Sequence, residues 1–103
     1  MKHFGITDPS WKLLQETFRS YPQVEEVILF GSRAKGNYSN GSDIDLAIKG
    51  EECSKSLALN LQTYMNEVLP IPYMVDVVDY ESLDHRELRD HIDRVGKLFY
   101  RRD

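Results

Sequence analysis

Two aspartates that alternate with apolar residues constrain this chain more than any other feature: Asp43 and Asp45 in the segment SDIDL at 42–46. Side chains alternate between the two faces of a strand, so both carboxylates point one way while Ile44 and Leu46 point into a core. Like charges held side by side on a rigid strand repel each other, and a cation between them relieves that cost. The segment therefore predicts a strand at 43–48 whose polar face binds a metal ion.

A second short motif, Gly31-Ser32, follows the apolar run 24–30 and lies ten residues before Ser42. Glycine has no Cβ, so the backbone can approach a phosphate closely. The Ser32 hydroxyl and the neighbouring amides can donate hydrogen bonds to phosphate oxygens. Arg33 and Lys35 add positive charge, and either could contact phosphate, lie in solvent or pair with a glutamate. We therefore predict a nucleotide-binding corner at Gly31, Ser32 and Arg33.

A third carboxylate interrupts the apolar segment VDVVD at 75–79. A lone charge on a buried strand is expensive, so Asp76 makes sense if its strand lies beside 43–48 and brings it to Asp43 and Asp45. Three carboxylates at one edge could hold two magnesium ions about 3.5–4 Å apart. The sequence thus predicts a metal-dependent nucleotide site with Asp76 as the third ligand.

Other titratable residues have plainer interpretations. Asp79 is the rival third ligand, but strand parity turns it away from Asp76, and it fits better as the cap of a turn at 80–82. The three histidines show no metal-binding spacing, so we expect them on the surface. Arg86 and His91 form an Arg-x4-His pattern, but five residues along a helix place them about 140° apart around its axis, so we interpret the pattern as coincidence.

Periodicity and punctuation predict an α/β order, αβ(turn)βαβα, with a small sheet and helices packed on it. Gly96 is a plausible end for the last helix, which would leave 98–100 extended instead of helical. The expected elements are a helix opened by an Asp8 cap and closed before Pro22, a strand at 24–30, a turn at 33–36, a strand at 43–48, a helix from a Ser54 cap to Val68, a strand at 74–78 and a helix through Leu88, Ile92 and Val95.

Length and composition favour one domain over residues 1–103. The net charge of −4 argues against a dedicated nucleic-acid binder, which would normally carry a basic face. The single cysteine, Cys53, excludes an internal disulfide and fits a cytoplasmic location. No signal peptide or membrane-spanning run is evident, so we expect no membrane association.

Together, GSRAKG at 31–36, SDIDL at 42–46 and a later third carboxylate resemble the signature of the nucleotidyltransferase superfamily that includes DNA polymerase beta. The resemblance runs from about residue 24 to residue 100. It implies the polymerase beta palm-like fold, a small mixed sheet flanked by helices. It also implies that Asp43, Asp45 and Asp76 are catalytic ligands of two Mg2+ ions, and that Gly31 and Ser32 clamp the triphosphate of ATP.

The short chain is similar to the minimal nucleotidyltransferases (MNT proteins), which lack the helical substrate-binding domain of larger relatives. Such proteins are typically encoded beside a HEPN-domain partner in a toxin–antitoxin pair. The resemblance implies an antitoxin that transfers AMP from ATP to a tyrosine of its HEPN ribonuclease toxin. An acidic chain with little room for an acceptor-binding domain fits a protein acceptor.

Two alternatives stay open at this point. One is a non-catalytic antitoxin that inhibits its HEPN partner by covering it, with the acidic cluster idle. The other is modification of a small molecule, as in the aminoglycoside nucleotidyltransferases, for which a homo-oligomer could build the missing pocket. The sequence does not identify the nucleobase, the number of nucleotides added or the acceptor hydroxyl.

Overall fold

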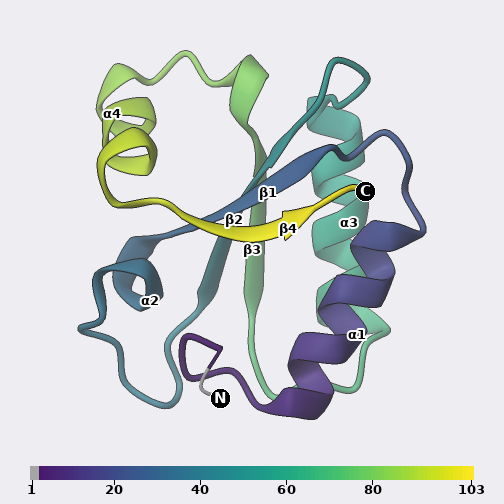
Figure 1. The fold of residues 1–103 in the computed structure, drawn as a ribbon, viewed down its shortest axis with the longest axis vertical. Coiled ribbons are helices and arrows are strands. Elements are labelled where there is room, and N and C mark those ends of the chain that lie inside the picture. Colours follow the sequence, from purple (N-terminus) through teal and green to yellow (C-terminus); the bar gives the residue numbers. More distant parts are fainter. Residues whose placement is uncertain (1–2) are drawn as a thin grey trace.

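Four strands form one mixed sheet with helices on both of its faces in the computed structural model, which describes residues 3–103 (Figure 1). The strand order is β3-β2-β1-β4; β2 and β3 run parallel, and the other neighbours are antiparallel. This arrangement confirms the predicted α/β class and mixed sheet. The elements are α1 (Asp8–Arg19), β1 (Glu26–Phe30), α2 (Gly31–Lys35), β2 (Ile44–Lys49), α3 (Lys55–Glu67), β3 (Val75–Asp79), the 3-10 turn η1 (Tyr80–Ser82), α4 (Arg86–Val95) and β4 (Lys97–Arg101).

Two details differ from the sequence prediction or decide between its alternatives. Thr7, instead of Asp8, occupies the N-cap position of the first helix. Asp8 is therefore the first residue of the helix and Pro9 the second. After Gly96 the chain is extended, and β4 pairs with β1 through the register Glu26↔Arg101. The extended alternative for 98–100 is thus confirmed, and the sheet gains an edge strand beyond the three predicted.

Helices α1 and α3 cover one face of the sheet, where the main core lies (Figure 1). The alternation predicted for the second strand is present, because Ile44, Leu46 and Ile48 are fully buried in this core. Burying an aliphatic side chain of this size contributes about 1.5–3 kcal/mol. The helices contribute the buried residues Leu14, Phe18, Ala58, Leu61 and Met65.

The opposite face of the sheet carries a smaller apolar cluster and the polar residues of interest. Phe30, Ala47 and Ile92 form this cluster, in which Ile92 comes from α4. Figure 1 shows α4 and the short α2 on this side, away from α1 and α3. The two-faced packing fixes the register of β2, because a shift by one residue would turn its aspartate into the main core.

Strand β3 lies at an edge of the sheet, and two side chains of α3 hydrogen-bond its outward backbone groups. The Asn66 side-chain amide accepts a hydrogen bond from the Val75 N–H at 2.8 Å and donates one to the Val75 carbonyl at 2.9 Å. The Gln62 amide oxygen accepts from the Val77 N–H at 2.8 Å. These contacts mimic a neighbouring strand, and they fix the strand that carries Asp76 against α3.

We predict that Asn66→Ala destabilises the fold by about 1–3 kcal/mol, because it leaves backbone groups of Val75 partly buried without partners. Urea unfolding of the variant measures this difference. Asn60→Ala on the same helix is the matched control, since Asn60 is exposed, and it should stay within about 0.5 kcal/mol of the parent. Equal stabilities for the two variants would contradict the edge-capping role.

Within the described part of the chain, residues 3–103, no helix is both long and apolar enough to cross a bilayer.

Candidate active site

Three strand ends meet at one end of the sheet, and Asp45 lies in the middle of them. In the antiparallel pair Asp45 is the partner of Phe30, the last residue of β1, and in the parallel pair it is the partner of Asp76. Register partners on neighbouring strands point to the same face. Asp45 and Asp76 are therefore cross-strand neighbours, as the sequence predicted, with the Gly31-Ser32 corner directly after Phe30.

The charge state of Asp45 reflects this crowding. Burial, followed by the charges of Asp76 and Asp43, raises the pKa of the Asp45 carboxyl from 3.8 to about 6. A hydrogen bond with Asp76 acts in the same direction, since a shared proton stabilises the neutral form. The pair therefore holds its second negative charge poorly, and a cation between the carboxylates would remove the penalty.

Asp43 lies one residue before β2, outside the regular strand, and its side chain is exposed. It is close enough for its charge to raise the pKa of Asp45. Among residues 3–103, however, no three acidic, histidine or cysteine side chains are grouped as they stand in a way that could hold a metal ion. The structure thus brings Asp45 and Asp76 together. That Asp43 joins them as a third metal ligand stays a prediction.

The donors available at this site are carboxylate oxygens, which are the ligands that Mg2+ prefers. Burial raises the pKa of Asp45 most, and the charges of Asp76 and Asp43 add to it; a divalent cation would neutralise that added repulsion. In the chemistry of their donors, Asp45 and Asp76 with Asp43 next to them suit magnesium, and a complete site requires Asp43 to move toward the pair.

Gly31 occupies a position that only glycine fits. Its φ of +76° lies in the left-handed region, and a Cβ there would collide with Oδ2 of Asp45. The backbone of the corner therefore packs directly against the central carboxylate. Ser32, the next residue, is half-buried in the short helix α2. A phosphate at the corner would consequently lie next to the acidic pair.

His91 is a site residue that the sequence analysis missed. It was expected at the surface, but its ring is half-buried on α4 and its Nε2 accepts a hydrogen bond from the Gly31 N–H at 3.2 Å. The ring also packs edge-on against Phe30, with centroids 6.0 Å apart. His91 thus holds the corner from the side of α4. The 60 residues between the two partners leave no local signal in the sequence.

The placement of Arg33 does not support the nucleotide-binding role predicted for it. Its side chain is 1% exposed, and its guanidinium donates to the carbonyls of Phe4, Asn40 and Ser42. The sequence could not reveal this burial, because one of its acceptors lies 29 residues earlier in the chain. Lys35, the other basic residue of α2, is exposed. Of the two side chains considered for phosphate contact, only Lys35 is free to move toward a ligand.

Asp79 is separated from the acidic pair, as strand parity predicted. It is 4% exposed on the core face of β3 and is the N-cap residue of η1. Its carboxylate accepts a hydrogen bond from the Ser82 hydroxyl instead of from a backbone N–H. The capping position is therefore confirmed, while the hydrogen bond that holds it differs from the usual cap.

The site is an open surface. Asp43 and Asp76 are exposed, and Asp45 is half-buried between them and the corner. A hollow of about 660 Å3 lies at the other end of β2, around Lys49 and Gly50, and contains none of the predicted site residues. Its lining is rich in charged side chains, among them Glu26, which pairs with Arg101. We place the chemistry at Asp45 and Asp76 instead, because those carboxylates lie beside the Gly31-Ser32 corner.

Comparison with known proteins agrees with this arrangement. The sequence matches the family described as "Polymerase beta, Nucleotidyltransferase" over residues 12–103. It has no match among curated protein sequences.

The structure is similar to MNT antitoxins solved in toxin–antitoxin complexes. A toxin–antitoxin structure with AMP-PNP matches at a TM-score of 0.68 and 22% identity, covering 90% of this chain and 73% of the other. The toxin–antitoxin MntA–HepT matches at 0.65 and 21%, covering 90% and 71%. The MNT antitoxin complex with a tri-AMPylated HEPN toxin of Shewanella oneidensis matches at 0.59 and 21%, covering 86% and 71%. At these identities the likeness establishes the fold.

We predict that Asp45→Asn stabilises the protein at neutral pH relative to the parent. The raised pKa means that the native state binds the Asp45 proton more tightly than the unfolded chain does. Stability from this group is therefore present below about pH 4 and is lost as the pH rises through about 6. Asparagine mimics the protonated acid, so the variant should gain on the parent as the pH rises.

Thermal unfolding of both proteins between pH 4 and 8, without divalent cations, measures this effect. The difference in Tm, variant minus parent, should be small at pH 4, widen as the pH rises to about 6 and level off at higher pH. Asp84→Asn, an exposed acid in the turn before α4, is the control and should show no such widening. A difference in Tm that shrinks with rising pH would contradict the repulsion between the carboxylates.

Proposed function

Because the chain belongs to the polymerase beta nucleotidyltransferase family, we propose that it is a magnesium-dependent enzyme that transfers AMP from ATP to a protein hydroxyl. The acceptor we propose is a tyrosine of a HEPN-domain ribonuclease toxin encoded by an adjacent gene, which makes the chain an antitoxin. The observation that carries the proposal is the Asp45–Asp76 pair against the Gly31 corner.

The three carboxylates Asp43, Asp45 and Asp76 would hold the metal in this proposal. Two Mg2+ ions bound there would neutralise the triphosphate, favour ionisation of the acceptor hydroxyl and stabilise the leaving pyrophosphate. The strands make Asp45 and Asp76 rigid partners. Asp43, one residue outside β2, would complete the set.

The phosphates would be held by the corner and by α2. Gly31 lets them approach the backbone closely, and the Ser32 hydroxyl can donate a hydrogen bond to a phosphate oxygen. The exposed Lys35 supplies a mobile positive charge on the same helix. Arg33, whose buried guanidinium donates to backbone carbonyls, would support the corner instead of contacting the nucleotide.

The reaction is an in-line displacement at the α-phosphorus. The acceptor oxygen forms a bond to the α-phosphorus while the bond from that phosphorus to the bridging oxygen breaks, and pyrophosphate leaves with the bonding electron pair. The acceptor proton passes to a carboxylate of the cluster, for which Asp76 is the residue we propose. Its side chain is exposed on the edge strand, where an incoming acceptor could reach it.

The open surface favours a macromolecular acceptor. Small-molecule transfer requires a walled pocket around the second substrate, whereas Asp43 and Asp76 are exposed. Solved relatives were crystallised with HEPN toxins, one of them tri-AMPylated. Both observations support a protein partner, which would bring its hydroxyl to the exposed carboxylates.

We predict that Asp43→Ala abolishes AMP transfer and leaves the fold intact, because Asp43 is exposed and outside the strand. The purified chain is mixed with the product of its adjacent gene, ATP and Mg2+, and the partner is weighed by mass spectrometry. The parent should add one or more AMP units. Asp84→Ala, which removes an exposed acid outside the site, should transfer as the parent does.

Two outcomes would contradict the proposal. Transfer that persists in Asp43→Ala would refute the metal site. A partner of unchanged mass that still associates tightly with the parent chain would instead indicate an antitoxin acting by steric cover. Such an inhibitor would need neither ATP nor magnesium.

A further inference from the structure

Arg33 is a buried cation that has no acidic partner among residues 3–103. It is 1% exposed, and no ion pair involving it is recorded within the described residues 3–103. Desolvating a guanidinium is costly unless its donors are satisfied. Here Nη1 donates to the Phe4 carbonyl at 2.9 Å, Nη2 to the Ser42 carbonyl at 2.8 Å and to the Asn40 carbonyl at 3.3 Å, and Nε to the Ser42 carbonyl at 3.2 Å.

Two aromatic rings complete the environment of the guanidinium. The carbon Cζ of Arg33 lies 5.0 Å from the ring centroid of Tyr38 and 5.0 Å from that of Tyr73. Cation–π contacts of this kind attract the guanidinium, and the attraction is stronger when they are shielded from water. The charge is thus stabilised by carbonyls and rings instead of by a carboxylate.

The segments that Arg33 joins are those that lead into the acidic strands. Ser42 directly precedes Asp43, and Tyr73 lies three residues before Asp76. Arg33 itself follows the Gly31-Ser32 corner within α2. The Arg33 side chain, which comes from α2, therefore contacts the residues that lead into both strands that carry the aspartates: Ser42 before β2 and Tyr73 before β3.

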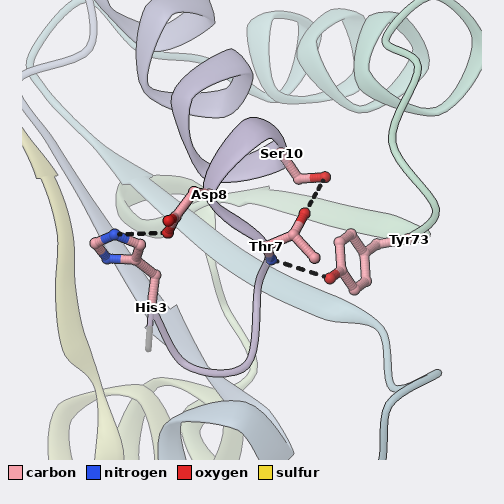
Figure 2. A network of polar contacts seen from close by, with 5 residues as sticks. All are labelled: His3, Thr7, Asp8, Ser10 and Tyr73. Carbon is pink, nitrogen blue, oxygen red and sulfur yellow. Dashed lines mark hydrogen bonds and ion pairs between the residues drawn. The ribbon is translucent and has the colours of Figure 1, made fainter. Parts of the chain in front are cut away.

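The N-terminal turn at residues 3–8 contacts both Arg33 and Tyr73. Phe4 has a φ of +56°, an unfavourable value for a bulky residue, and its carbonyl is the acceptor for Arg33. The Thr7 N–H donates to the Tyr73 hydroxyl at 3.1 Å, while Thr7 also bonds Ser10 (Figure 2). Figure 2 shows the same turn held at its other end, where His3 Nε2 lies 3.6 Å from Asp8 Oδ1. The turn is thus tied to both Arg33 and Tyr73.

We propose that Arg33 is a positioning residue that sets the separation of Asp43 from Asp76 and thereby the affinity of the site for divalent cations. It acts through the Ser42 carbonyl and the Tyr73 ring, without touching nucleotide or metal. This inference rests on the proposed function, because it takes the carboxylates to be metal ligands. Groups that orient metal ligands in this way typically change metal affinity by about 10–100-fold when removed.

The test is Mn2+ binding to the full chain without nucleotide, measured by the relaxation of water protons. Arg33→Lys keeps the charge but cannot reach three carbonyls with a planar fork. Its Kd for Mn2+ should rise about 10-fold or more, and Arg33→Met should show at least the same loss. Arg19→Met, which removes an exposed arginine of α1, should bind Mn2+ as the parent does.

Circular dichroism and thermal unfolding separate positioning from a general loss of structure. A folded Arg33→Lys protein with weakened Mn2+ binding supports the proposal. A folded variant with parental affinity overturns it, and so does a variant that does not fold, because Arg33 would then act only in folding. If the parent protein does not bind Mn2+, that result contradicts the proposed function itself and not only the role of Arg33.

Discussion

The contact between two carboxylates across the parallel strands β2 and β3 is the interaction from which the site follows. Asp45 and Asp76 are register partners, and their proximity, with burial, raises the pKa of Asp45 to about 6. A fold does not gain stability from such a pair, since each charge opposes the other. In the proposed function, a divalent cation and a phosphate would account for its place beside a left-handed glycine and an exposed third acid.

Much of this site could be predicted from local sequence, because strand parity is a local property. The alternation in 42–46 set the face of Asp45, and the same rule separated Asp76 from Asp79. Both placements hold in the structure. The sequence also indicated that Gly31 allows a close approach of the backbone. The neighbour that requires glycine there is Asp45, a residue of another strand, which the local sequence does not reveal.

The remainder depends on contacts between residues far apart in the chain. Nothing near His91 indicates that its ring accepts a hydrogen bond from Gly31, 60 residues earlier. Arg33 was predicted to bind phosphate because a basic side chain directly after Gly-Ser could reach a phosphate at the corner if it were exposed. Its burial depends on Phe4, Ser42 and Tyr73, which only the tertiary structure brings together. The edge strand after Gly96 likewise depends on pairing with β1.

The most direct test of the account is to observe the carboxyl carbons of Asp43, Asp45 and Asp76 by NMR during a Mg2+ titration with a non-hydrolysable ATP analogue. All three signals should shift together and saturate at one Mg2+ concentration, because Asp43, Asp45 and Asp76 would hold the ions as one set of ligands. Shifts confined to other carboxylates, or an Asp76 signal that does not move, would contradict it.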